Sequence, residues 1–361
     1  MKKQKQQATS RLCFLARNFR NLDVAGYKAK ADYEEILIRL GAVNLGINRT
    51  KIKNKIIEFL INLCGVILFV FRVRSTDFIV LQYPIKKYYR FLCHVAKWKG
   101  ATTCTLIHDL GCFRRKKLSV EEEIRKLSLT DIVIATNETM QEWLRKQGLQ
   151  VRLEHLGLHD YLSETPYRVR PIVPDTLIYA GNIAARKNAF LADTANWLDD
   201  NMHLYIYGYN DGTVSSDAKH VHLCGFITPE EFIEKAPAGF ALIWDGDSAF
   251  TPTGIYGEYL HYCTHHKASL SLRAGQPLLV YEHSAIAPLV ERLGIGIKVR
   301  SLADASSKLK ELCRDKERCQ QMQVAVQNTA EKIAQGGFLH EALKRCGAPI
   351  SQAFQHECEL T

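Results

Sequence analysis

The residues best suited to bind a charged ligand lie in the segment 259–277. A helix predicted to begin near His266 would present Lys267 and Ser269 in its first turn. Free backbone N–H groups and the helix dipole there attract an anion such as a phosphate. The alternative is an ordinary surface helix, but the adjacency of His265, His266 and Lys267 favours the anion site.

The same segment contains histidines at a spacing that can bind a metal. His261 and His265 are four residues apart, so they share one face of a helix, and His266 follows directly. No carboxylate or cysteine stands at a convincing ligand spacing beside them. We therefore expect no metal site.

Four short apolar runs earlier in the second half end on small or polar residues. The first, residues 176–182, is followed by a predicted helix over 183–193 that carries Arg186 and Lys187. A strand–glycine–helix junction with a cation in the first turn can hold a diphosphate. Because the carboxyl ends of parallel strands meet at one edge, we expect the four tips to surround one cleft. The tips are Gly181 with Asn182, Gly208 with Tyr209, Gly225 with Phe226, and Trp244 with Asp245 and Gly246.

Two further candidates follow predicted strands in the first half. Asp109, or alternatively His108, can act as a general base toward a hydroxyl group, since both come directly after a strand; a simple turn cap is the competing interpretation for Asp109. The loop that holds Gly26, Tyr27 and Lys28 precedes a helix predicted to begin near Asp32. Gly26 permits a close backbone approach to a ligand, and an ordinary strand-to-helix turn is the alternative.

Parallel sheets must position these residues. Near-continuous apolar strands at 11–17, 77–83, 102–108 and 131–136 alternate with helical stretches, which is typical of an α/β fold with helices on both faces of a parallel sheet. A chain of 361 residues accommodates two such domains. The predicted division is a basic domain over residues 1–170, a second domain over 171–337, and a helical tail over 338–361 that can pack back on the first domain.

The charge is divided unevenly between the two halves. Residues 1–170 contain 31 Lys and Arg against 16 Asp and Glu, whereas the rest contains 17 against 22. This indicates a polyanionic partner for the first half, either a membrane surface or nucleic acid. No nucleic-acid-binding motif is present, so we expect no nucleic-acid partner.

The most apolar stretch, Ile56–Phe71, is flanked by basic residues. With 16 residues it is shorter than a bilayer-crossing helix, which needs about 20. It is either a buried core helix or an interfacial helix in the headgroup plane, and the basic flanks favour membrane contact. The eleven cysteines lack C-x-x-C spacing, and no secretory signal is present. We expect a cytoplasmic protein, peripheral at the inner face of the cell membrane.

The residues quoted so far resemble bacterial glycosyltransferases of the GT-B fold, which have two Rossmann-like domains facing each other across a cleft. The resemblance is carried by Ile243–Gly246, Tyr262–Lys267, Ser269, Gly275 and Pro277, and extends to Tyr179–Asn182 with Lys187, Gly26–Ala29 and His108 with Asp109. Within this fold, the sequence resembles in particular the β-1,6-galactofuranosyltransferases of polysaccharide synthesis and the second glucosyltransferase of streptococcal adhesin glycosylation.

The resemblance implies a nucleotide-sugar donor, usually a UDP-sugar, in the second domain, and an acceptor in the first, with no essential metal or other cofactor. It implies that Lys187, His266 and Lys267 contact the diphosphate. Backbone near Gly181, Gly208 and Tyr209 would hold the nucleoside, and the loop 26–28 would face the acceptor and the reacting sugar. The implied acceptor is a glycan, a lipid-linked sugar or a glycoprotein. The resemblance leaves the oligomeric state open, and a homo-oligomer is one alternative.

One segment departs from the family pattern. Where the family has Tyr-Asn-Asn-Pro-His-Lys, this chain has Cys263, Thr264 and His265 in place of Asn-Asn-Pro. Two amide side chains near the donor are therefore replaced, which leaves the transferred hexose (galactofuranose, glucose or galactose) open. The expected reaction is an inverting displacement at the anomeric carbon. The rival hypotheses are a sugar-nucleotide epimerase and a catalytically inactive, membrane-associated partner protein.

Overall fold

The computed structural model describes residues 10–17, 25–50, 54–85, 87–114, 118–215 and 217–351. The chain divides into two compact units. The first unit comprises residues 1–135, 141–156 and 339–361, and the second comprises 136–140 and 157–338.

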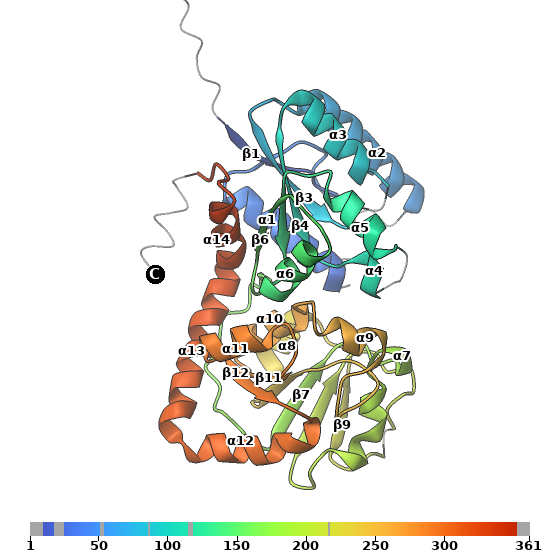
Figure 1. Cartoon of the computed structure of the whole chain (residues 1–361). Helices are drawn as coiled ribbons and strands as arrows, with labels where there is room; N and C mark the ends of the chain where they lie inside the picture. The colour runs from blue at the N-terminus through green and yellow to red at the C-terminus, as the bar shows by residue number, and fades with distance from the viewer. Residues whose placement is uncertain are drawn as a thin grey trace, which may run out of the picture. The chain divides into compact units, whose positions relative to one another are not determined.

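The first unit is built on a six-stranded sheet in which all neighbouring strands of the described residues pair in parallel (Figure 1). The inner strands are formed by buried apolar runs, as expected for a sheet covered on both faces. The strand order is β2-β1-β3-β4-β5-β6. The strands are β1 (Arg11–Phe14), β2 (Val43–Asn44), β3 (Asp77–Tyr83), β4 (Thr102–Ile107), β5 (Ile132–Ala135) and β6 (Arg152–His155).

Helices connect these strands and cover both faces of the sheet. Parallel crossovers are right-handed. The connection from β1 to β2 runs in the opposite direction to the later ones, so its helix α1 lies on one face, and α2 and α3 lie on the other. The helices are α1 (Ala25–Arg39), α2 (Lys55–Arg72), α3 (Tyr89–Lys99), α4 (Gly111–Arg114), α5 (Val120–Leu127), α6 (Glu138–Lys146) and α14 (Gly337–Arg345).

The second unit repeats this architecture with a sheet ordered β12-β11-β10-β7-β8-β9, and its neighbouring strands again pair in parallel within the described ranges. Its strands are β7 (Thr176–Ala180), β8 (His203–Tyr207), β9 (Val221–Gly225), β10 (Phe240–Ile243), β11 (Leu278–Tyr281) and β12 (Gly296–Val299). Its helices are α7 (Ala185–Asn188), η1 (Ala189–Asn196, 3-10), α8 (Pro229–Lys235), α9 (Gly254–Tyr259), α10 (His266–Arg273), α11 (Ala287–Leu293), η2 (Leu302–Asp304, 3-10), α12 (Ala305–Arg314) and α13 (Lys316–Gln335).

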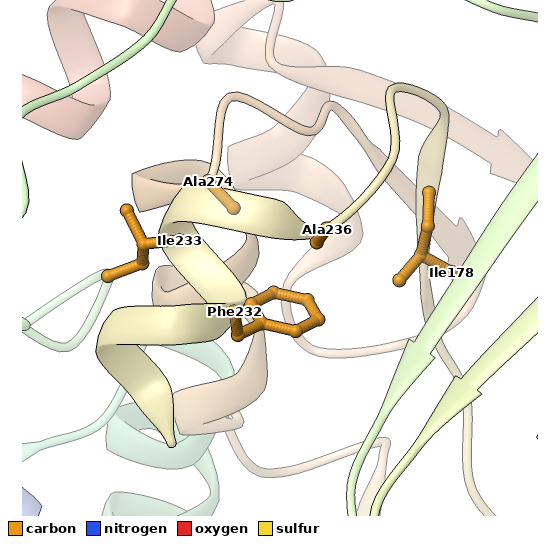
Figure 2. Packing of buried hydrophobic residues seen from close by; sticks show 5 residues of the cluster. All are labelled: Ile178, Phe232, Ile233, Ala236 and Ala274. Atoms are coloured by element: carbon orange, nitrogen blue, oxygen red, sulfur yellow. The ribbon is translucent and has the colours of Figure 1, made fainter. Parts of the chain in front are cut away.

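Helix α8 shows how this sheet is covered. Thr228 caps the helix and Glu231 bonds back to the cap, and Pro229 occupies the first turn. Phe232 and Ile233, with Ala236 beyond the helix end, are buried against Ile178 of β7 and Ala274 after α10 (Figure 2). The packing joins α8, α10 and the sheet into one core, which fixes the position of α10 relative to the strand ends.

The strands predicted at 77–83, 102–108, 131–136 and in the second half are confirmed, as is a helix beginning at His266. Three strands escaped prediction: β2, β6 and β12. β2 has only two residues, and β6 and β12 are edge strands in which buried and exposed residues mix, so none forms an apolar run.

One predicted helix differs from the structure, and another is confirmed. The helix predicted over 183–193 is a single α-turn, α7, followed by the 3-10 segment η1. The stretch Ile56–Phe71 does form a helix, α2, which Asn54 caps by accepting from Ile56 N at 2.8 Å. Among the described residues, no helix is long and apolar enough to cross a membrane.

Candidate functional site

The carboxyl edge of the second sheet brings together most of the predicted donor-binding residues. β10, β7 and β8 are neighbours, and Asp245, Gly181 and Gly208 follow their ends. A Cβ atom at Gly208 would lie 2.1 Å from the carbonyl oxygen of Gly181. Only glycine permits this close approach of two strand ends.

Asp245 is the centre of this edge and is fully buried. Its Oδ1 accepts a hydrogen bond from the Tyr179 hydroxyl at 2.7 Å and lies 3.0 Å from Lys267 Nζ and 3.7 Å from Lys187 Nζ. His265 Nε2 lies 3.4 Å from the other oxygen, Oδ2. A buried carboxylate is costly unless opposite charges and hydrogen bonds compensate it. Here two ammonium groups, an imidazole and a phenol do so.

A second set of contacts fixes the residues around Asp245. Asn188 Nδ2 donates to the Tyr179 hydroxyl at 2.7 Å and to the Asn182 carbonyl at 3.0 Å. Lys267 Nζ donates to the Trp244 carbonyl at 2.7 Å and lies 4.5 Å from the centre of the Tyr179 ring. Trp244 O and Asp245 account for two of the three N–H donors of the Lys267 ammonium. The third donor meets no oxygen acceptor in the part of the chain that the structure describes, so it can reach a ligand oxygen.

The charges and the burial of this cluster shift the pKa values of Asp245 and Lys267. Burial would raise the pKa of the Asp245 carboxyl, but the charges of Lys187 and Lys267 outweigh burial and hold that pKa well below its ordinary value. Burial lowers the pKa of Lys267 to about 8, an effect that Asp245 opposes and Lys187 reinforces. At neutral pH two ammonium groups face one carboxylate, so the edge is positively charged and suited to a diphosphate.

The start of α10 adds polar groups to this edge. His266 is its first residue and stacks on His159, with ring centroids 3.7 Å apart. Burial lowers the pKa of His159 to about 4, so this ring is neutral at pH 7. Ser269 is fully buried, and its hydroxyl has no hydrogen-bond partner within the described ranges.

The other predicted donor residues divide into core and surface. The Trp244 side chain is fully buried and donates from Nε1 to the Ser248 carbonyl at 3.0 Å, so it belongs to the core and only its carbonyl oxygen contacts the cluster. Asn182 is exposed beside α7. Tyr209 is 64% exposed and stacks on Phe226, with centroids 4.9 Å apart and ring planes within 6°.

The segment that departs from the family pattern is held by Thr264. Its hydroxyl donates to the Gly157 carbonyl at 3.1 Å and accepts from Asn137 Nδ2 at 3.1 Å. Asn137 Nδ2 also donates to the Tyr262 carbonyl at 3.1 Å. These buried bonds fix the turn that delivers His265 to Asp245.

The three histidines considered as metal ligands make separate contacts. His261 Nδ1 pairs with the His283 carbonyl at 2.9 Å, His265 faces Asp245, and His266 stacks on His159.

In the first unit, His108 follows β4 and is held by Gln82. Gln82 Nε2 donates to the Lys30 carbonyl at 3.0 Å, which orients the amide. Its Oε1 therefore accepts from His108 Nε2, 2.8 Å away, and a neutral His108 carries its lone pair on Nδ1. Asp109, the next residue, is half-buried.

The prediction of a loop at 26–28 ahead of a helix near Asp32 is wrong, because α1 begins at Ala25. Lys28 Nζ lies 2.8 Å from Asp32, one turn further along the helix. Such an ion pair four residues apart supports the first turns of a helix, as do Ala29 and Ala31. Gly26, Tyr27 and Lys28 are therefore helical residues.

Several residues of these two sites were not foreseen. Tyr179, Asn188 and His159 contact predicted residues directly, and Gln82 orients His108. Gln82 had a detectable signal, since it is the one amide in the otherwise apolar core of strand 77–83.

Comparisons with known proteins agree with these two units. Residues 13–158 match the N-terminal domain, and residues 177–346 the C-terminal domain, of the glucosyltransferase 3-like family. The β-1,6-galactofuranosyltransferase WbbI of Escherichia coli is 24% identical over 330 residues, which cover 91% of this chain and 95% of that protein. Glucosyltransferase 3 of Streptococcus gordonii is 26% identical over 214 residues, 57% of this chain and 59% of that protein.

Two solved structures share the fold. HepE of Anabaena in complex with UDP has a TM-score of 0.56 at 12% identity and covers 93% of this chain and 100% of HepE. TarM has a TM-score of 0.50 at 13% identity and covers 78% of this chain and 58% of TarM. The expected α/β fold of the GT-B type, with two Rossmann-like units, is confirmed.

Proposed function

The chain belongs to the glucosyltransferase 3-like family and is a glycosyltransferase. We propose that it transfers a hexosyl group from a UDP-sugar to a glycan or lipid-linked acceptor in the synthesis of a cell-surface polysaccharide. The observation that carries the donor assignment is the positively charged cluster of Lys187 and Lys267 around Asp245 at the strand tips. WbbI is named for galactofuranosyl transfer, and HepE was solved with UDP and with UDP and glucose.

The diphosphate binds at the second unit in this proposal. The free N–H donor of Lys267, the Lys187 ammonium, and the backbone N–H groups at the start of α10 with His266 face its oxygens. These groups stabilise the negative charge that develops on the leaving UDP in the transition state. Asp245 holds both lysines in place and so acts as a positioning residue. Gly181, Gly208 and Tyr209 lie at neighbouring tips and supply the nucleoside contacts.

Acceptor activation belongs to the first unit. A base removes the proton of the acceptor hydroxyl as its oxygen attacks the anomeric carbon; the bond to UDP breaks, and the configuration inverts. His108 is favoured because Gln82 fixes the tautomer with its lone pair on Nδ1. Asp109 is the competing base. Tyr27 and Lys28 contribute acceptor contacts from the first turns of α1.

The proposal also assigns a role to each part of the chain and a location to the protein. Residues 1–170 bind the acceptor, 171–337 bind the nucleotide sugar, and 338–361 form a tail on the first domain. The protein works at the inner face of the cell membrane, attached peripherally by its basic half. The nucleotide sugar is a co-substrate, and the proposed chemistry uses no metal or other cofactor.

The test is UDP release from a panel of UDP-hexoses, with and without candidate acceptors, after a thermal-shift screen of nucleotides. Stabilisation by UDP and acceptor-dependent release support transfer. Conversion of the UDP-sugar without UDP release would instead identify an epimerase. A protein that no nucleotide stabilises would contradict the proposal and favour an inactive partner.

A further inference from the structure

Helix α2 carries an apolar stripe that the rest of the described chain does not cover. Its exposed residues Ile56, Leu60, Cys64, Ile67 and Phe71 follow one another at steps of three and four, which places them on one side of the helix. Ile56 is 69% exposed and Phe71 is 78% exposed. The stripe therefore runs along the whole helix.

The opposite side already attaches α2 to the first unit. Gly65, Val66 and Phe69 are buried. A Cβ atom at Gly65 would lie 3.6 Å from the backbone nitrogen of Ile47, so the helix packs closely on the segment after β2. Arg72 Nη1 also donates to the Gly46 carbonyl at 2.7 Å. The stripe is thus not needed to hold the helix in place.

Helix α3 exposes a face of a different composition. Its exposed residues Arg90, Phe91, His94, Lys97 and Trp98 are basic or aromatic, and the helix contains no acidic residue. Trp98 is 78% exposed. Aromatic and basic side chains together are typical of the membrane–water interface, where rings lie at headgroup depth and cations contact phosphates.

The two helices lie on the same face of the first sheet, because β2 to β3 and β3 to β4 are crossovers in the same direction (Figure 1). A side-chain contact also links them: Lys87, two residues before α3, places Nζ 4.8 Å from the centre of the Phe59 ring of α2. Apolar and basic groups therefore form one surface, which we call the α2–α3 surface.

The charge around this surface is strongly positive. The described residues 54–85 and 87–100 contain seven Lys and Arg, and their only acidic residues are Glu58 and Asp77. Asp77 is buried and pairs with Arg11 at 2.9 Å, so it does not offset the surface charge.

We propose that the α2–α3 surface docks the protein on an anionic lipid bilayer, with the stripe of α2 among the upper acyl chains and the cations of α3 against the phosphates. The inference rests on the proposed function, and specifically on its lipid-linked acceptor, which is held in such a bilayer. A second copy of the chain is a poorer occupant, because two positive surfaces would face each other.

The experiment is co-sedimentation of the full chain with phosphatidylcholine vesicles, with and without phosphatidylglycerol. Binding is expected only with the anionic lipid and should weaken with added salt. Phe71→Gln should weaken it about tenfold, and Lys97→Gln about fivefold. The control is Ile38→Gln, because Ile38 is 54% exposed on α1, which covers the other face of the same sheet.

A second measurement reports the orientation. Quenching of tryptophan fluorescence by brominated lipids should be strong in the wild type and lost in Trp98→Phe, which keeps the other three tryptophans. The proposal would be overturned if the wild type did not bind vesicles, or if Ile38→Gln lost as much vesicle binding as Phe71→Gln. A dimer in sedimentation velocity that Phe71→Gln dissociates would also overturn it. UDP binding measured without vesicles tests the enzymatic proposal separately, so failure of one is distinguishable from failure of the other.

Discussion

The carboxyl edges of the two sheets have the same backbone architecture and opposite chemistry. In the second unit, the edge is organised around a buried ion cluster, with Asp245 between Lys187 and Lys267. In the first, His108 is held by a neutral amide, Gln82, which is anchored on a backbone carbonyl. A positive cluster binds and stabilises phosphate charge, whereas a neutral imidazole of fixed tautomer can accept a proton. The comparison gives a physical reason for the proposed division, in which the second unit binds the donor and the first removes the proton.

The largest expected effect separates the two edges by kinetics. His108→Gln should reduce kcat by about 100- to 10,000-fold, because it removes the base, while the Kd for UDP stays within twofold of wild type. Asp109→Asn is the matched comparison at the neighbouring position. Steady-state kinetics and calorimetric UDP titration measure the two quantities. A large loss in Asp109→Asn with full activity in His108→Gln would transfer the role of base to Asp109.

Lys267→Met addresses the second edge. It removes a buried cation that Asp245 compensates, and should weaken UDP binding about 100-fold through the lost charge-assisted bonds. Lys235→Met is the control, because Lys235 lies on α8 and is 63% exposed. A thermal melt followed by circular dichroism should show that both variants are folded, because Asp245 loses a partner in Lys267→Met. Unchanged UDP affinity in a folded Lys267→Met protein would contradict the assignment of this edge to the diphosphate.

The pH dependence of UDP binding is the third and smaller effect. Burial lowers the pKa of Lys267 to about 8 in the free protein, and a bound diphosphate would raise it again. Above pH 8 a proton must therefore be taken up on binding, so the Kd for UDP should rise by up to about tenfold per pH unit. Calorimetry between pH 7 and 9.5 should show this rise in the wild type, and a flatter profile in Lys267→Met. A flat wild-type profile would exclude Lys267 as the titrating contact.

The sequence predicted the strand tips better than the interactions at them. Gly181, Gly208, Asp245 and Lys267 lie at one edge as expected, because apolar strands and glycine junctions are local patterns. What Asp245 does there depends on contacts with Tyr179 and Lys187, more than 50 residues away in the chain, and no local pattern encodes them.

The start of α1 shows a second limit of prediction. Gly26 looked like a loop residue because glycine disfavours helices, but Ala29 and the Lys28–Asp32 pair stabilise the helix beyond it. Trp244 shows a third limit. A strand-end aromatic looks available to a ligand, whereas tertiary packing against Phe190 and Tyr281 buries it.

The smallest expected effect concerns the exposed aromatic pair at the second edge. Tyr209 and Phe226 follow the adjacent strands β8 and β9 and stack in parallel, so their outer faces offer a flat apolar surface beside the Gly181 and Gly208 tips. If the nucleoside lies there, Phe226→Ala should weaken UDP binding about fivefold by loosening Tyr209, and leave pyrophosphate binding unchanged. Phe250→Ala is the control, since Phe250 is similarly exposed in the same unit. Equal losses for UDP and pyrophosphate would show that the pair supports the phosphate cluster rather than the base, and the nucleoside would then have to be sought at another strand tip.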